Sequence, residues 1–143
     1  MTLALEVKVP REELFKLISD SIKYDMSLHS KKRFEEGAMY NKTLNNYKGK
    51  PRAVTISITA LSEECIEFFT ASKKLKIKTN YSLDVQGSTT QINYSESLIN
   101  NGWLEKLNYN IMSFIYQKRN KKKLLHQFRS MENYYLDTIK KNP

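Results

Sequence analysis

The chain has 143 residues, 40% of them hydrophobic, and 24 Lys and Arg outnumber 15 Asp and Glu for a formal net charge of +9. This length suits a single domain over residues 1–143 with a real core, and four Gly and three Pro are too few for a disordered chain. No apolar run approaches the roughly 18 residues of a membrane-spanning helix, and the N-terminus lacks a signal-peptide pattern, so we expect a cytoplasmic protein.

The first thirty residues predict a strand followed by a helix. Apolar and polar residues alternate over 3–9, which is typical of a half-buried strand, and Pro10 ends it. Pro10 followed by Glu12 and Glu13 suits the N-terminus of a helix. Apolar residues then recur at helical spacing, so we predict a helix over about 11–28.

Four or five short strands follow. The alternation of apolar and polar residues is strongest over 54–60 and continues over 75–85 and 92–98. The connections are short, so neighbouring strands should pair antiparallel. One face of the sheet would be apolar and the other polar, and Lys76 and Lys78 would lie on the polar outer face.

After Gly102 the pattern becomes helical and continues to about Lys140. On a helical wheel, the apolar residues of 103–115 and those of 124–139 form two stripes that are offset by roughly a quarter turn. One straight helix cannot bury both stripes without burying lysines, so we expect a bend, loop or break near 117–122. Laid across the apolar face of a curved sheet, this helix completes an α+β fold, and any gap between the layers becomes a cavity.

Several stretches resemble a known superfamily. The segments LEVKVPREELFKLISD and INYSES are similar to the first strand and helix and to the last strand of START-like proteins. These form the SRPBCC group, which includes polyketide cyclases and birch-pollen-allergen-like proteins. NGWLEKLN and KKKLLHQF resemble a small family of Gram-positive bacterial proteins known as a domain of unknown function.

The resemblance implies a helix-grip fold, in which a curved antiparallel sheet wraps around a long C-terminal helix, bent or broken, with one N-terminal helix after the first strand. It also implies a hydrophobic cavity between the sheet and the C-terminal helix, which the superfamily commonly uses for lipids, hormones or aromatic metabolites. It supplies no catalytic residue and no cofactor. Some members of the superfamily are enzymes, but many only bind.

Glu96 is the sharpest single candidate for chemistry. It shares a strand face with Ile92, Tyr94 and Leu98. If this face points inward, burial raises the pKa of the carboxyl and makes it a general acid or a polar anchor for a ligand. The alternatives are that Glu96 reaches solvent near the strand end or pairs with a lysine.

Aromatic residues on the apolar face suit either a pocket wall or plain core packing. Tyr81 and Tyr94 belong to strands that should pair, and their hydroxyls would orient a ligand if a pocket exists. Phe68 and Phe69 point to opposite faces, so at most one of them faces inward. The predicted ligand-binding residues are Tyr81, Tyr94, Glu96, Phe68, Trp103, Leu107, Ile111 and Phe128.

Other chemistries lack their signatures. His29 and His126 are far apart and have no partner at metal-ligand spacing, so we expect no metal. Cys65 has no histidine nearby in sequence, and a buried, inert thiol is the interpretation we favour. The glycines are isolated and form no phosphate-binding loop, so we expect no cofactor.

A basic block in the C-terminal helical segment, formed by Lys118, Arg119, Lys121, Lys122 and Lys123, has three interpretations. It is a solvated joint between two packed helical segments, or a foot on an anionic membrane, or a nucleic-acid grip. We favour the joint, keep the membrane as an alternative, and do not expect nucleic acid, because no recognised binding motif accompanies the block.

The two-layer pattern and the resemblance together imply a bacterial protein that binds a small apolar or amphipathic molecule between the sheet and the C-terminal helix. The alternative is an enzyme of cyclase, hydrolase or isomerase type that uses Glu96 with a tyrosine. We expect a binding protein rather than an enzyme.

Overall fold

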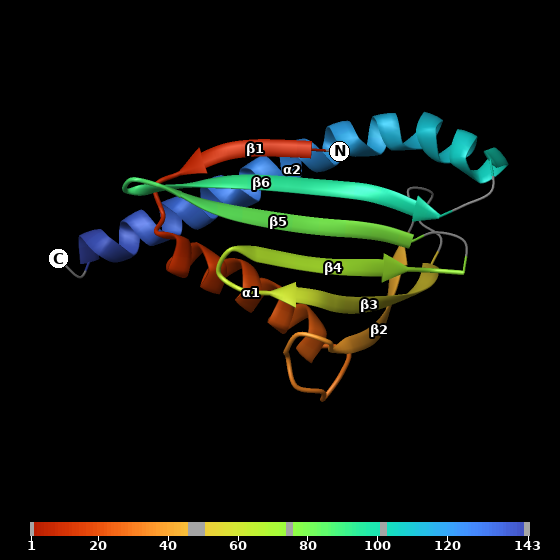
Figure 1. Cartoon of the computed structure of the whole chain (residues 1–143), viewed down its shortest axis with the longest axis horizontal. Coiled ribbons are helices and arrows are strands. Elements are labelled where there is room, and N and C mark those ends of the chain that lie inside the picture. Colours follow the sequence, from red (N-terminus) through yellow and green to blue (C-terminus); the bar gives the residue numbers. More distant parts are fainter. Residues whose placement is uncertain (1, 46–50, 74–75, 101–102, 142–143) are drawn as a thin grey trace.

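The computed structural model describes residues 2–45, 51–73, 76–100 and 103–141, and side chains at 45, 52 and 100–120 lie outside the description. A strand and a helix are followed by five strands and a second helix (Figure 1). The elements are β1 (Thr2–Val7), α1 (Arg11–Ser27), β2 (Met39–Asn45), β3 (Pro51–Leu61), β4 (Cys65–Ala71), β5 (Lys76–Gln86), β6 (Thr89–Asn100) and α2 (Trp103–Lys141).

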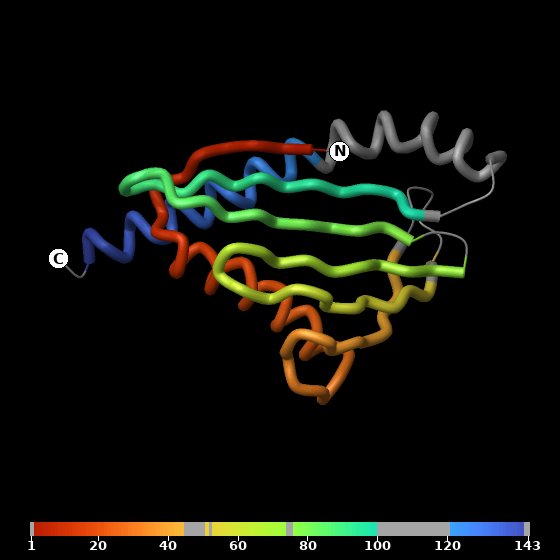
Figure 2. Tube along the Cα trace, viewed as in Figure 1, coloured from red at the N-terminus to blue at the C-terminus, as the bar shows by residue number. Residues whose placement is uncertain are grey.

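The strands form one antiparallel sheet in the order β1-β6-β5-β4-β3-β2. Both helices lie on the same face of this sheet (Figure 1). The edge strands β1 and β2 lie on opposite sides of it, as the chain trace shows (Figure 2). A curved sheet that holds its helices on one face is the α+β helix-grip arrangement that the sequence predicts.

The first strand and helix form as their sequence pattern predicts. Burial alternates along β1, where Leu3, Leu5 and Val7 face the core. Pro10 precedes α1, and its carbonyl accepts a hydrogen bond of 2.9 Å from the Leu14 amide. The apolar stripe of α1 then packs on the inner face of the sheet.

Cross-strand register decides which side chains face the helices. Tyr81 lies opposite Tyr94 in the β5–β6 pair, and Phe68 lies opposite Thr79 in the β4–β5 pair. Tyr94 and Thr79 are both only 5% exposed, so this parity forms the inner face, on the side of the helices. Phe69 therefore lies on the outer face, which answers the question that the sequence left open.

Lys76 and Lys78 lie on the outer face, as predicted. The Lys76 ammonium is 4.8 Å from the centroid of the Phe69 ring, and the Lys78 ammonium is 3.4 Å from a Glu67 carboxylate oxygen. These contacts are partly exposed and contribute little stability. They identify the outer face as a solvated surface with local charge pairing.

Two apolar clusters hold the layers together. The larger one lies where β1, β5 and β6 meet both helices, and α2 contributes the buried side chains Leu124 and Phe128. The smaller one joins the C-terminal end of α1 to β2 and β3. Its buried members are Met26, Tyr40, Val54, Ile56 and Ile58.

The C-terminal half of α2 is also fixed to the β1 edge by polar contacts. The backbone amide of Lys8 donates to a Glu132 carboxylate oxygen at 2.6 Å. The Arg129 guanidinium donates to the Glu6 carbonyl at 3.3 Å and to Glu132 at 3.0 Å. This half of α2 is thereby held on the sheet along its buried stripe.

α2 is one continuous helix from Trp103 to Lys141, so the expected loop or break near 117–122 is wrong. The segment contains no Gly or Pro that would end a helix. Lys121, Lys122 and Lys123 are exposed immediately before the buried Leu124, so the helix continues without burying these lysines. The bend, the remaining alternative, falls in a segment that lies mostly outside the fully described residues, and it stays a prediction.

Candidate functional site

The inner face of the sheet is covered unevenly. Near the β5–β6 turn, the inner-face residues Leu83 and Ile92 are almost fully buried by the core. Along the same strands, Ile77 and Leu98 lie opposite each other on the inner parity but are only half-buried. Solvent therefore reaches part of an apolar surface that lies on the helix side of the sheet.

Phe68 and Glu96 extend this half-buried surface across the strands. They flank Thr79, which lies opposite Phe68 on β4 and opposite Glu96 on β6. Both side chains are partly accessible, whereas Thr79 between them is buried. The half-buried inner surface, defined as Phe68, Ile77, Glu96 and Leu98, is thus apolar with one carboxylate.

Three aromatic residues that were predicted to bind a ligand meet beside this surface. The Tyr81 and Tyr94 rings pack edge to face with centroids 5.0 Å apart, and the Tyr81 and Phe128 centroids are 6.2 Å apart in the same geometry. Tyr94 and Phe128 are core residues with exposures of 5% and 2%. Tyr81 is more accessible and lies between the core and the half-buried inner surface.

The Tyr81 hydroxyl remains protonated at neutral pH. Burial first, and then the negative charge of Glu96, raise the pKa of Tyr81 to about 12. A phenol in this state donates a hydrogen bond and does not act as a base. The electrostatic influence of Glu96 also indicates that the carboxylate and the phenol share one neighbourhood on the inner face.

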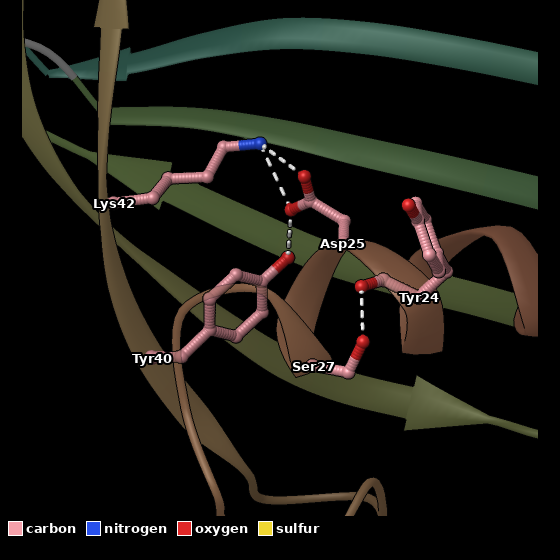
Figure 3. Close-up of polar contacts among 5 residues, drawn as sticks. All are labelled: Tyr24, Asp25, Ser27, Tyr40 and Lys42. Atoms are coloured by element: carbon pink, nitrogen blue, oxygen red, sulfur yellow. Dashed lines mark hydrogen bonds and ion pairs between the residues drawn. The ribbon is translucent and has the colours of Figure 1, made fainter.

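A second polar group on the helix side was not predicted from the sequence. Asp25, in the last turn of α1, accepts hydrogen bonds from two side chains of β2 (Figure 3). The Tyr40 hydroxyl lies 2.6 Å from Asp25 Oδ2. The Lys42 ammonium lies 3.0 Å from Oδ1 and 2.9 Å from Oδ2. We call these three residues the Asp25 network.

The network holds its carboxyl group ionised. Partial burial raises the pKa of Asp25, but the hydrogen bonds from Tyr40 and Lys42 and the charge of Lys42 outweigh it, so the pKa lies below its usual value. Burial and the adjacent carboxylate raise the pKa of Tyr40. The His29 ring stacks on the Tyr40 ring with centroids 6.5 Å apart. Asp25 and Lys42 therefore form a fixed ion pair.

The sequence held a signal for this network. Asp25 follows Ile18 by seven residues and Ile22 by three, so it falls on the apolar stripe of the helix. Tyr40 and Lys42 are two residues apart and therefore share a face when this segment forms a strand. A charge on each of two apolar faces predicts a pair only when the helix and the edge strand are known to be neighbours.

Some predicted site residues lie outside the described part of the chain. The backbone of α2 includes positions 103, 107 and 111, but the side chains of Trp103, Leu107 and Ile111 are among those not described. The same holds for Lys118 and Arg119. Their roles stay predictions, whereas Phe68, Tyr81, Tyr94, Glu96 and Phe128 are placed on the helix side of the sheet.

Among the described residues, no group of three His, Cys, Asp or Glu side chains could hold a metal ion. The half-buried Cys65 thiol accepts a hydrogen bond from the Asn80 amide at 3.4 Å. No helix in the described ranges is long and apolar enough to cross a membrane.

Solved structures share the fold. Ara h 8.0201 superposes with a TM-score of 0.58 at 18% identity, covering 96% of this chain and 98% of that chain. TTHA0849 from Thermus thermophilus gives 0.64 at 12% identity, with coverage of 96% and 97%. A protein from Arthrobacter aurescens gives 0.65 at 9% identity, with coverage of 93% and 85%. These likenesses show the helix-grip fold.

Sequence comparison gives one family. A family model described as "Domain of unknown function (DUF3284)" matches residues 1–117. No curated protein matches the chain. The matched region contains β1 to β6, α1 and the beginning of α2, and so includes the half-buried inner surface and the Asp25 network.

Proposed function

The chain thus belongs to the DUF3284 family, whose description names no activity, and we propose that it binds a small apolar or amphipathic molecule on the inner face of the sheet. The observation that supports this most is the half-buried inner surface. Phe68, Ile77 and Leu98 face the helices but stay accessible, while Ile66, Thr79 and Tyr94 on the same strands are buried. A partly accessible apolar surface between two layers is where small-molecule sites usually form.

Burial of apolar area would drive binding. A ligand that covers these three accessible side chains removes apolar surface from water, at roughly 25 cal/mol per Å². Tyr81 and Glu96 would then set the orientation of the ligand, since a protonated phenol donates and a carboxylate accepts. In this proposal Trp103, Leu107 and Ile111 of α2 form the opposite wall.

Native mass spectrometry after gentle purification tests the proposal. We expect the protein to carry a co-purifying molecule that denaturation and lipid extraction release. Protein that carries no molecule, and that also fails to bind the neutral fluorescent probe Nile red, would contradict the proposal.

An enzyme that uses Glu96 with Tyr81 is the second candidate, because the charge of Glu96 reaches the Tyr81 hydroxyl. General-acid chemistry requires a carboxyl pKa well above the ordinary value of about 4.3. Titration of the Glu96 carboxyl by NMR distinguishes the two proposals. A Glu96 pKa near the ordinary value would exclude the enzyme and leave the binding function.

Contact with an anionic membrane is a separate proposal for the basic block. Lys121, Lys122 and Lys123 are exposed, which such contact requires but which a solvated surface also shows. Liposomes that contain phosphatidylserine test it. Salt-sensitive binding that is lost in the Lys118/Lys121/Lys122→Glu variant supports it, and equal binding by the variant excludes it. A cytoplasmic location and a Gram-positive bacterial origin stay predictions of the sequence.

A further inference from the structure

A charged side chain occupies an inner-face position of the sheet. Tyr40 and Lys42 share the inner parity of β2, and Lys42 lies opposite Val54, which is buried in the core. The Lys42 side chain is 18% exposed to solvent, and the Asp25 side chain is 34% exposed. The ion pair is therefore on the helix side of the sheet and is still reached by solvent.

Counting donors shows that the Lys42 ammonium has spare capacity. It carries three N–H groups, and its two hydrogen bonds to Asp25 use at most two of them. The Tyr40 hydroxyl uses its one hydrogen on the same carboxylate. At least one N–H of Lys42 has no acceptor among the described residues.

Phe68 of the half-buried inner surface packs against the apolar cluster that contains Tyr40, so the Asp25 network borders this surface. We propose that the remaining N–H of Lys42 is the polar anchor of the ligand site and donates to an uncharged oxygen, a carbonyl or a hydroxyl, on an otherwise apolar molecule. This inference rests on the proposed binding function and names the class of ligand. The Asp25 network fixes the ammonium in place before the ligand arrives, so little side-chain entropy is lost on binding.

The charges on the helix side of the sheet favour a neutral oxygen over an anionic one. Lys42 is already neutralised by Asp25, whose carboxylate lies 2.9 Å from the ammonium. A ligand carboxylate at Lys42 would meet the Asp25 carboxylate as well as the ammonium, and it would also lose its own hydration. A carbonyl oxygen accepts the hydrogen bond without these costs.

Three aromatic probes of nearly equal shape test the inference. Naphthalene has no oxygen, 2-acetylnaphthalene carries a neutral carbonyl, and 2-naphthoate carries a carboxylate. Dissociation constants are measured by displacement of Nile red from the full chain. Because hydrogen bonds to charged donors are strong, 2-acetylnaphthalene should bind about tenfold more tightly than naphthalene, and more tightly than 2-naphthoate.

Two variants identify the donor. In Lys42→Met, the ratio of the naphthalene and 2-acetylnaphthalene dissociation constants should fall to about one. In Asp25→Asn, the ammonium loses its counter-charge, so 2-naphthoate should bind about tenfold more tightly than it does to the unmodified protein. Circular dichroism checks that both variants are folded. If Lys42→Met does not fold, the affinity of Asp25→Asn for 2-naphthoate tests the inference.

The outcomes separate this inference from the proposed function. Naphthalene that binds without any gain from the carbonyl overturns the inference and leaves the proposed function intact. So does a carbonyl preference that persists in Lys42→Met, or 2-naphthoate affinity that is unchanged in Asp25→Asn. Failure of all three probes to bind overturns the inference and counts against the proposed function as well.

Discussion

The Lys42 ammonium lies 2.9 Å from Oδ2 of Asp25, and this ion pair joins the edge strand β2 to the last turn of α1. The two residues are 17 positions apart in sequence. Both are partly exposed, so the pair adds only modestly to stability. Its main effect is to hold a charged donor at a defined place on the helix side of the sheet.

We predict that this pair makes stability depend on acid pH. The folded-state pKa of Asp25 is lowered, so its contribution is present above the unfolded value of about 3.9 and is lost as pH falls through the folded value. Asp25→Asn should therefore lower the free energy of unfolding at pH 7 by about 1 kcal/mol and lose less stability on acidification. Urea denaturation at pH 7 and near pH 3 measures both effects.

Asp20→Asn is the matched control for this measurement. Asp20 is an exposed carboxylate on the same helix. It should change the free energy of unfolding by less than about 0.5 kcal/mol at pH 7. Equal pH dependence in the unmodified protein and in Asp25→Asn would contradict the role assigned to the Asp25 network.

Phe68 and Phe69 offer a comparison between the two faces of one strand. Phe68→Ser removes an apolar side chain from the half-buried inner surface and should weaken Nile red binding by about tenfold or more. Phe69→Ser removes a ring from the outer face and should leave binding nearly unchanged. Equal loss in both variants would show that the probe does not bind on the inner face.

The influence of Glu96 on Tyr81 can be measured directly. Because burial is the larger cause, Glu96→Gln should lower the Tyr81 pKa from about 12 but leave it above the ordinary value of about 10. NMR of ¹³C-labelled tyrosine, with Tyr81→Phe to assign the signal, follows the titration. Glu67→Gln, on the outer face, is the control and should not alter this pKa.

The raised pKa of Tyr81 also has a consequence for stability. Its contribution is fully present below the unfolded pKa of about 10 and is lost as pH rises towards the folded value of about 12. Alkaline unfolding should therefore depend less on pH in Tyr81→Phe than in the unmodified protein. Identical alkaline profiles would indicate that the phenol is not protected in the folded state.

Phe128 should carry much of the attachment of α2. It is 2% exposed and contacts Tyr81, so Phe128→Ala should destabilise the protein by about 3–5 kcal/mol. Tyr134, on the same helix, is 65% exposed, and Tyr134→Ala should cost less than about 0.5 kcal/mol. Thermal or urea unfolding compares the two variants. Similar losses in the free energy of unfolding would contradict the packing described for α2.

Much of the fold follows from alternation and helical spacing. The strand parity predicted that Tyr81 and Tyr94 share a face and that Lys76 and Lys78 lie on the other, and both are confirmed. The helix predicted over about 11–28 is observed over Arg11–Ser27. These features are local, because each depends on the geometry of one strand pair or one helix.

The parts that sequence reasoning missed depend on tertiary packing. The pairing of Asp25 with Lys42 requires α1 to lie beside the edge strand, which no local pattern encodes. The expected loop or break in α2 assumed that both apolar stripes must bury on one flat surface, but the helix continues through the lysines. The half-buried state of Ile77 and Leu98 likewise depends on tertiary packing, because no local pattern sets how the helices cover the sheet.

A ligand on the inner face must contact the methyl groups of that face, and methyl NMR with bound naphthalene tests this most directly. Leu98 and Ile99 are adjacent in β6, but Leu98 shares the inner parity with Ile77, while Ile99 has the opposite parity and is 48% exposed. We predict nuclear Overhauser contacts from naphthalene to the methyl groups of Leu98 and Ile77 and none to Ile99. Contacts to Ile99 alone, or none to any of the three, would contradict binding on the inner face.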